Sequence, residues 1–599
     1  MPQGDRSMSI DSASGGEEFP TAVDVVILGA GINGAALARE LVLNGCSVVV
    51  VDDDDIAAGT TRWSTRLVHG GLRYLEYGEL GLVRESLAER NRLLQLAPHL
   101  VRPLGFVVPV SGWFGGLRAA AARILGCESL ARRWAGKRGR GGITVACGLW
   151  LYDLLSTGAL WPRRCLVPTT AAGMPAVDAD RFPLAGVYDD AQMRFPERFT
   201  VELLVDARTI AAGRSLPFEV RSRHTAHLEA DGRLRVAPQA APGGVSSAAG
   251  VLHLTPRAIV NATGAWVDRT LEALLPVRLG ADGAPLIGGT KGSHLLVDHA
   301  ALRAGLGVHG VYAEAEDGRP VFVLPFGDRL VLVGTTDIPF HGDPAAARTD
   351  GEEIDYLLAA VRRLFPGAAL SRGAVVQHYC GVRPLPARRA DGRSPAGITR
   401  RHLLIRHPQA PLPLWSIVGG KLTTCRSLAE GAAAEILAVL GRPVTATSRS
   451  RPLPGACSAR EAEELVGRLS ARAVAAGLPG PVAEGLARSV VGLFGAQAER
   501  ALEGGAGASA ADAFALLAGS RLPRGIVRYC CDEEWGETLA DLVERRLLLV
   551  FDPDLTVTTL RAIAAELVTE GRLGAESVDG EIAALVALMA DRYGKRLVD

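Results

Sequence analysis

The sequence predicts an α/β fold in which a Rossmann-like dinucleotide-binding domain is combined with a mixed-sheet substrate domain and a C-terminal α-helical domain. The first observation is a βαβ half-unit, with a buried strand at 24–28, a glycine-rich turn, a helical run ending at Leu43 and a second strand at 47–51. The second is the stretch 186–340, in which strand signals dominate. The third is the helical spacing of apolar residues after Pro454.

A chain of 599 residues is too long for one hydrophobic core, so several domains are expected. We predict a disordered tail at 1–20, an oxidoreductase region at 21–450 with interleaved subdomains, and a helical domain at 451–599. The tail lacks the basic start and apolar centre of a signal peptide. The individual elements expected are a loop at 60–76, a helix at 85–96, strands at 252–254, 258–260, 294–297, 321–324 and 330–334, and helices from 422, at 461–476 and at 560–567.

Composition and charge restrict the possible partners. Hydrophobic residues make up 48% and charged residues 22% of the chain, which is typical of a folded protein. Basic and acidic residues balance at 65 each, so nothing in the net charge indicates a nucleic-acid partner. The nine cysteines form no Cys-x-x-Cys pair and indicate reduced thiols in a cytoplasmic protein. No stretch approaches about 20 apolar residues, so any membrane contact is expected to be peripheral.

The turn after the first strand has the G-x-G-x-x-G spacing of a dinucleotide site, at Gly29, Gly31 and Gly34. The first glycine permits the tight turn, the second lets the backbone approach a pyrophosphate, and the third lets the helix pack on the strand. Asp52 ends the second strand, where a carboxylate accepts hydrogen bonds from ribose hydroxyls. We therefore predict a nucleotide site here. The alternative is a purely structural glycine-rich turn that binds no ligand.

Both NAD and FAD bind to such a unit, and a second motif favours FAD. Ala262, Thr263 and Gly264 follow the apolar strand at 258–260. An Ala-Thr-Gly after a strand, far from the first motif, is similar to the second dinucleotide-contact segment of many two-domain FAD enzymes. We predict an FAD-binding, Rossmann-like flavoprotein domain with two dinucleotide-binding segments, and we predict no metal site.

The run 64–76, Ser-Thr-Arg-Leu-Val-His-Gly-Gly-Leu-Arg-Tyr-Leu-Glu, resembles a signature of the FAD-dependent glycerol-3-phosphate dehydrogenases of the aerobic, respiratory type. Four further segments agree with that family in order and spacing, at 291–294, 334–337, 381–385 and 419–424. The resemblance covers 24–430 well and 451–599 loosely. Besides the two motifs above, it implies cofactor contacts from Asn33, Thr60, Ser64, His69, Gly70, Gly71, Gly420, Lys421, Leu422 and Thr423.

The resemblance also implies a phosphorylated substrate, and the residues agree with this. Arg73, Arg383 and Lys421 lie beside glycines or a proline, in loops suited to converge on a phosphate dianion. Each alone could equally be a solvated surface charge. We expect the substrate to be bound by Arg73, Tyr74, Lys291, Arg383, Lys421 and Thr423.

Oxidation of an alcohol requires a base for the hydroxyl proton, and imidazole titrates in the suitable range. His294 lies in a segment that the family places near the substrate, and His69 lies in the loop expected to surround the flavin. We predict His294, His69 and Arg383 as catalytic residues. A route assisted by arginine or water is left open, and each histidine could instead be structural.

The chain departs from the family pattern in three places. Cys425 stands where tyrosine is common, and 191–199 replaces a usual acidic-then-Ala-Arg-Leu segment, in which Arg198 and Phe199 could stand for the Arg-Leu pair. The stretch 112–141 reads as a helical, basic insertion: from 113 to 140 it has seven basic residues against one acidic residue, together with tryptophans. Such a helix can lie on an anionic membrane, or it can pack, solvated, on the flavin domain.

The expected reaction is the oxidation of sn-glycerol 3-phosphate to dihydroxyacetone phosphate, with hydride passing to flavin N5. The resemblance implies a membrane quinone as electron acceptor and a location on the cytoplasmic face, while O2 as acceptor stays open. The alternatives are an amine or amino-acid oxidase on the same scaffold and a non-catalytic flavoprotein sensor. The stretch 451–599 carries no chemical signature, and could cap the substrate domain or support a homodimer.

Overall fold

An eight-stranded sheet forms the nucleotide-binding half of the protein in this computed structural model, which describes residues 20–113, 141–156, 165–239, 250–275, 284–387, 401–503 and 510–597. Its main path is β17-β18-β10-β1-β2-β7. All neighbours along it are parallel except the edge strand β17. The bounds are β1 (Ala22–Leu28), β2 (Val48–Val51), β7 (Phe218–Arg221), β10 (Leu252–Asn261), β17 (Leu403–Arg406) and β18 (Leu414–Val418), with β8 (His224–Leu228) and β9 (Leu234–Pro238) attached to β10.

This sheet is covered on both faces, which explains why its strands are continuously apolar. One face packs against helices α1 (Ile32–Leu43), α6 (Pro196–Gly213) and α10 (Cys425–Val439). The other face packs against α7 (Val267–Leu274) and the strands β8 and β9. The carboxyl ends of β1, β2 and β10 therefore share one edge, where ligands of open α/β sheets bind.

A ten-stranded mixed sheet forms the second half, in the order β15-β11-β14-β13-β12-β4-β6-β3, with β16 beside β11 and β5 beside β6. Helices α8 (Ala300–Leu306) and α9 (Gly351–Leu364) pack on one face in an apolar cluster. Its strands are β3 (Leu67–Val68), β4 (Val101–Val110), β5 (Cys165–Pro168), β6 (Leu184–Met193), β11 (Thr290–Asp298), β12 (Gly310–Glu314), β13 (Pro320–Phe326), β14 (Leu330–Gly334), β15 (Ile338–Pro339) and β16 (Val375–Arg383).

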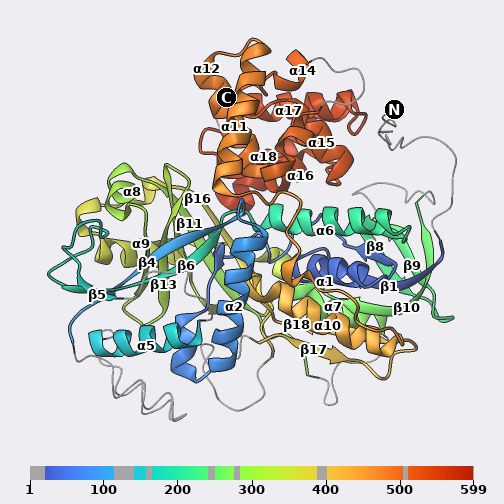
Figure 1. The fold of residues 1–599 in the computed structure, drawn as a ribbon, viewed down its shortest axis with the longest axis horizontal. Helices are drawn as coiled ribbons and strands as arrows, with labels where there is room; N and C mark the ends of the chain where they lie inside the picture. Colours follow the sequence, from blue (N-terminus) through green and yellow to red (C-terminus); the bar gives the residue numbers. More distant parts are fainter. Residues whose placement is uncertain are drawn as a thin grey trace, which may run out of the picture.

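Helices make up the C-terminal part, which lies above the junction of the two sheets (Figure 1). Its buried residues belong to one apolar cluster with residues of the second sheet, among them Tyr379 and Phe326. The helices are α11 (Ala459–Ala475), α12 (Gly480–Phe494), α13 (Ala498–Leu502), α14 (Ala510–Phe514), α15 (Gly525–Glu533), α16 (Leu539–Asp541), α17 (Val557–Thr569) and α18 (Val578–Tyr593), with a π-helical turn η10 (Leu542–Arg546).

The predicted fold class is confirmed, and several predicted elements differ in detail. The strands expected at 252–254 and 258–260 are one strand, β10, and the long helix α6 interrupts the region expected to be mainly strands. The expected loop 60–76 contains β3 and a 3₁₀ helix (Leu72–Tyr77), and α2 (Leu80–Leu96) begins earlier than predicted. The tail 1–20 and the insertion 112–141 lie outside the described residues, except for Pro20, Gly112, Trp113 and Gly141.

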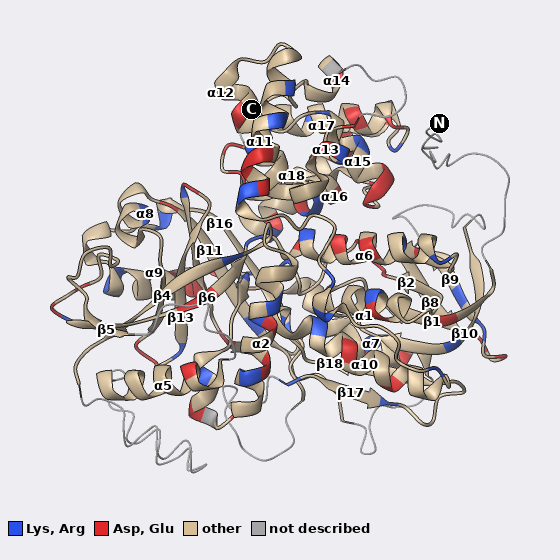
Figure 2. Cartoon of the chain, in the orientation of Figure 1, with Lys and Arg blue, Asp and Glu red and all other residues tan. Residues whose placement is uncertain are grey.

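The expectations from composition concerned the cysteines, the charge balance and membrane-spanning segments. Their cysteines are free thiols. Acidic and basic side chains are interspersed over the three parts of the chain (Figure 2). Within the same residues, no helix combines the length and the apolar character needed to cross a bilayer.

Candidate active site

A cavity of about 950 Å³ lies between the two sheets, at the carboxyl ends of β1, β2 and β10. Its size is at the upper end of the range of about 300–1,000 Å³ for ligand sites. Segments far apart in sequence form its wall. They are the turn after β1, the loop after β2, the residues after β10, strands β11 and β16, and the loop after β18.

The glycine-rich turn has the geometry of a phosphate-binding turn. Gly29 has φ +105°, and its N–H donates to Val51 O at 2.7 Å. A Cβ at Gly34 would lie 1.9 Å from Gly29 O, so Gly34 lets α1 pack closely against the turn. Gly29, Gly31 and Asn33, which the sequence predicts as cofactor contacts, line the cavity. Gly34, predicted with them, does not line it and packs behind the turn.

Asp52 connects the end of β2 to this turn. Its carboxylate accepts from Ala30 N at 2.6 Å and from Asp54 N at 2.9 Å, and it lines the cavity. Burial raises the pKa of Asp52 to about 7, and the charges of Asp53 and Asp54 act in the same direction. The two backbone hydrogen bonds oppose this shift. A carboxylate in this place can accept hydrogen bonds from a ribose.

The second predicted segment lies directly against the first. Ala262 N donates to Leu28 O at 2.7 Å, and a Cβ at Gly29 would lie 2.7 Å from Ala262 O. Ala262, Thr263 and Gly264 all line the cavity. The parallel pairing of β1 with β10 is what brings the two motifs together.

The segment 60–71, which follows β2 and contains β3, contacts the loop after β18 and strand β16. Thr423 Oγ1 accepts from His69 N at 3.1 Å, and Thr60 Oγ1 donates to Val382 O at 2.9 Å. Of the contact residues predicted in these loops, Gly70 does not reach the cavity, because a Cβ there would lie 2.4 Å from the Tyr152 hydroxyl. The others line it: Thr60, Ser64, His69, Gly71, Gly420, Lys421, Leu422 and Thr423.

Three of the predicted cations lie on the cavity wall, namely Arg73, Arg383 and Lys421. Arg383 is held by Asp337 Oδ1 at 3.0 Å and by Thr335 Oγ1 at 2.8 Å. Its guanidinium lies flat over Gly292, where a Cβ would come within 2.1 Å of Nη2. The Lys421 ammonium lies 4.0 Å from the centre of the Tyr74 ring, which also lines the cavity.

Lys291, predicted as a substrate contact, does not line the cavity in this structure. Side chains alternate along a strand, and on β11 the cavity side is taken by Gly292 and His294. Lys291 points to α9, where its Nζ lies 2.7 Å from Glu353 Oε2. Glu353 also accepts from Ser293 Oγ at 2.8 Å.

His294 is buried at the cavity wall. Its Nε2 shares a hydrogen bond of 2.9 Å with Thr65 Oγ1, and its ring stacks on Tyr379 with centroids 4.9 Å apart. Burial lowers its pKa well below the usual value, and the charges of Arg383 and Arg66 lower it further. The imidazole is therefore neutral near pH 7 and able to accept a proton.

Thr65 and Asp337 are among the cavity residues that were not predicted as site residues. Both lie inside quoted sequence segments, 64–76 and 334–337, so the spacing of those motifs is the signal that could have found them. Their roles depend on hydrogen bonds to His294 and Arg383, which no local pattern shows.

Two of the three departures from the family pattern, Cys425 and the segment 191–199, lie outside the cavity lining. Cys425 is fully buried in the apolar cluster under α10, and burial raises the pKa of its thiol to about 12. Glu197 forms a bidentate pair with Arg66, and Arg198 forms one with Glu534 of the C-terminal part. These substitutions therefore affect packing and domain contacts.

Comparisons with known proteins show which proteins this chain is similar to. A family model described as FAD dependent oxidoreductase matches residues 24–408. A glycerol-3-phosphate dehydrogenase of Synechocystis sp. is 35% identical over 73% of this chain and 74% of the relative. A D-erythritol 1-phosphate dehydrogenase of Brucella abortus is 29% identical over 88% of this chain and 94% of the relative. The structure of a glycerol-3-phosphate dehydrogenase from Bacillus halodurans, complexed with FAD, matches with a TM-score of 0.67 and 20% identity over 96% of this chain and 95% of that chain.

The fold and the cavity define an FAD-dependent oxidoreductase, since the family match covers well over half of the chain. The chain belongs to the family of the FAD-dependent glycerol-3-phosphate dehydrogenases, as its sequence motifs predicted. The cavity fits FAD, because the glycine-rich turn, the carboxylate of Asp52 and the segment 262–264 all line it. The buried Asn33 Oδ1 also lacks a hydrogen-bond partner among the described residues.

Asp52 provides a test of the cofactor site. If its carboxylate binds the ribose, protonation below its pKa of about 7 weakens FAD binding. For one titrating group we expect the dissociation constant of FAD to rise roughly tenfold from pH 8 to pH 6. Fluorescence titration of the FAD-free protein measures it. Asp52→Asn should bind more weakly and without this pH dependence, whereas Asp53→Asn should keep it; a constant value from pH 8 to 6 in the wild type would refute the assignment.

Proposed function

We propose that this protein oxidises sn-glycerol 3-phosphate to dihydroxyacetone phosphate. The observation that carries the proposal is the presence of Arg73, Arg383 and Lys421 on the wall of the cavity that fits FAD. A small phosphorylated alcohol offers little apolar surface, so charge-assisted hydrogen bonds to its phosphate must supply most of its binding. The related glycerol-3-phosphate dehydrogenase of Synechocystis sp. supports this choice of substrate.

Arg383 is the best-positioned phosphate ligand. Asp337, Thr335 and the carbonyl of Thr336 fix its guanidinium on one side. A guanidinium held in this way is pre-organised, which lowers the entropy lost on binding. Lys421 adds a second cation, whose ammonium group is positioned by a cation–π contact with the Tyr74 ring.

His294 is the proposed base for the substrate hydroxyl. Its Nδ1 is buried and has no partner among the described residues, so the proton is received at Nε2, the atom that contacts Thr65. Bound FAD supplies the hydride acceptor at N5. His69, which also lines the cavity, is the second candidate for the base.

Two other substrate classes have to be distinguished. The relative from Brucella abortus acts, by its name, on a longer phosphorylated polyol. An amine or amino-acid oxidase would bind a carboxylate, for which three cations are more than needed. A sensor without catalysis would have no use for a phosphate site. The comparison substrates are therefore D-erythritol 1-phosphate, sarcosine and D-amino acids.

Anaerobic mixing with glycerol 3-phosphate should bleach the absorbance of the bound flavin rapidly. Arg383→Ala should raise the apparent dissociation constant roughly 10- to 100-fold, from the loss of about 1.5–3 kcal/mol per charge-assisted bond. The flavin spectrum should stay unchanged. Arg348→Ala is the matched control, because Arg348 pairs with Asp591 and does not line the cavity. If Arg383→Ala binds glycerol 3-phosphate with normal affinity, the phosphate is bound elsewhere. If one of the comparison substrates bleaches the flavin faster, that compound replaces glycerol 3-phosphate as the proposed substrate.

The base is tested by the rate of bleaching at saturating substrate. His294→Asn should slow flavin reduction about 10²- to 10⁴-fold, the usual effect of removing a general base, with little change in substrate affinity. Because the pKa of His294 is lowered well below 6.5, the wild-type rate should not fall between pH 8 and 6.5. The same measurement on His69→Asn is the comparison: if only that variant loses the rate, His69 is the base.

We further propose a membrane quinone as the electron acceptor and a peripheral position on the cytoplasmic face.

Helix α5 (Gly142–Leu155) supports a membrane contact, because the side chains of Trp150 and Leu154 are 67% and 66% exposed. Trp113, 53% exposed, accepts at its carbonyl from Ile143 N at the start of α5. Its neighbours 114–140 lie outside the described residues and carry the seven basic residues of the insertion. Apolar side chains beside basic ones favour an anionic lipid surface.

Sedimentation with anionic liposomes tests this contact. Trp150→Asp combined with Leu154→Asp should abolish cosedimentation, since both apolar side chains leave the interface and negative charge is added. The control is Val308→Asp with Val482→Asp, which alters two exposed apolar residues outside α5. Equal binding of the two double variants would exclude α5 as the contact. For the acceptor, a water-soluble quinone should reoxidise the reduced flavin faster than O2, and the reverse order would favour an oxidase.

A further inference from the structure

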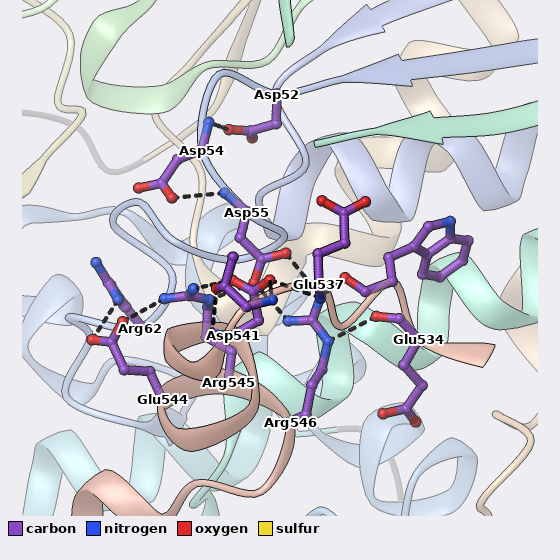
Figure 3. Close-up of polar contacts among 12 residues, drawn as sticks. Asp52, Asp54, Asp55, Arg62, Glu534, Glu537, Asp541, Glu544, Arg545 and Arg546 are labelled. Atoms are coloured by element: carbon purple, nitrogen blue, oxygen red, sulfur yellow. Dashed lines mark hydrogen bonds and ion pairs between the residues drawn. The ribbon is translucent and has the colours of Figure 1, made fainter. Parts of the chain in front are cut away.

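A buried cluster of charges connects the C-terminal helices to the loop after β2 (Figure 3). We call residues 55–62 the cofactor loop, because Ala58, Gly59, Thr60 and Thr61 within it line the cavity. The two ends of the loop, Asp55 and Arg62, point away from the cavity lining and carry opposite charges. Both are bound by the C-terminal part of the chain.

At the first end, Asp55 is fully buried and is held by two consecutive arginines. Its Oδ2 accepts from Arg545 Nε at 2.5 Å and from Arg546 Nη1 at 2.7 Å. Its Oδ1 accepts from Arg546 Nη2 at 2.8 Å. These guanidinium charges hold the pKa of Asp55 below its usual value in spite of burial, so it stays ionised.

At the second end, Glu544 holds Arg62. Glu544 Oε1 accepts from Arg62 Nη1 at 2.8 Å and from the Tyr593 hydroxyl at 2.6 Å. The other oxygen, Oε2, accepts from Arg545 Nη1 at 2.7 Å. The adjacent Trp63 packs on the Tyr593 ring with centroids 5.2 Å apart. Arg545 thus bridges both attachments, since it contacts Asp55 with Nε and Glu544 with Nη1.

The middle of the loop contacts the cofactor-binding elements. Thr61 Oγ1 accepts from Ile32 N at 3.1 Å, in the first turn of α1. Ala57 N donates to Ala30 O at 3.1 Å, inside the glycine-rich turn. At the N-terminal side, Asp55 N donates to Asp54 Oδ1, and Asp54 N donates to Asp52 Oδ1, as the chain of bonds in Figure 3 shows. Any displacement of the loop would therefore move the cofactor site.

Buried ion pairs of this kind are a weak source of net stability, because desolvation of the charges opposes their attraction. Their directional hydrogen bonds instead select one geometry. The three side chains reach the cofactor loop from η10, a π-helical turn. Such turns are rare and occur frequently at functional sites. We propose that Glu544, Arg545 and Arg546 are positioning residues for FAD, and that the C-terminal domain retains the cofactor by fixing the loop 55–62.

The experiment measures the release of FAD from the full-length holoenzyme. Flavin fluorescence after dilution gives the rate constant of release. Asp55→Asn and Arg545→Lys should each release FAD about tenfold faster or more, the size expected when one charge-assisted hydrogen bond no longer holds the loop. Hydrogen exchange of the amides at 56–61 should become faster in both variants, because the loop opens more often.

Glu534→Gln is the matched control. Glu534 forms a bidentate, buried pair with Arg198, so it belongs to the same interface between the C-terminal part and the rest of the chain. Arg198 lies on α6 and not in the cofactor loop. Glu534→Gln should lower the melting temperature, as the other variants do, but leave FAD release unchanged.

Two results would overturn the proposal. One is equal acceleration of FAD release by Glu534→Gln and Arg545→Lys. In that case the cluster would stabilise the interface in general and would have no specific role in holding the loop. The other is unchanged release in Arg545→Lys together with faster exchange at 56–61. If Asp55→Asn does not fold, Arg545→Lys decides alone, since it keeps the charge and loses the guanidinium fork that joins Asp55, Glu544 and Asp541. The outcome is independent of which substrate the enzyme oxidises.

Discussion

The close approach of helix α1 to the turn after β1 is the constraint on which the cofactor half of the protein depends. A side chain at Gly34 would collide with the carbonyl of Gly29, so the helix starts directly at the cavity edge. Ala30, within the turn, then donates to Asp52 and accepts from Ala57. The end of β2 and the loop that follows it are therefore positioned relative to one backbone turn. A small shift of α1 would displace the residues of the whole nucleotide site.

The second sheet contributes the functional side chains on the opposite wall of the cavity, because side chains alternate between the two faces of strand β11. On β11, Gly292 and His294 face the cavity, while Lys291 and Ser293 face Glu353 of α9. Gly292 leaves space for the flat guanidinium of Arg383, and Gly334 does the same for the ring of His294. Two glycines without any chemistry of their own thus determine where a cation and an imidazole lie.

The sequence was informative wherever function depends on local spacing. The βαβ unit, both nucleotide segments and the candidate cations Arg73, Arg383 and Lys421 could be predicted, because glycines and strand ends mark such positions in the chain. The position of Lys291, away from the cavity and against Glu353, could not be predicted, because membership of a motif does not show which face of a strand a residue occupies. The pairing of Asp55 with Arg545, 490 residues apart, could not be predicted, since nothing near either residue indicates its partner.

That separation has a consequence for the order in which the protein matures. Ribosomes make a chain from its N-terminus, and early domains fold while later ones are still being synthesised. The glycine-rich turn, β2 and the loop 55–62 are made first, and Arg545, which holds the loop, is made 490 residues after Asp55. Asp55 therefore has no guanidinium partner from η10 until 490 further residues have been made. Under the proposed role of these arginines, retention of FAD by the C-terminal helices begins only after that point.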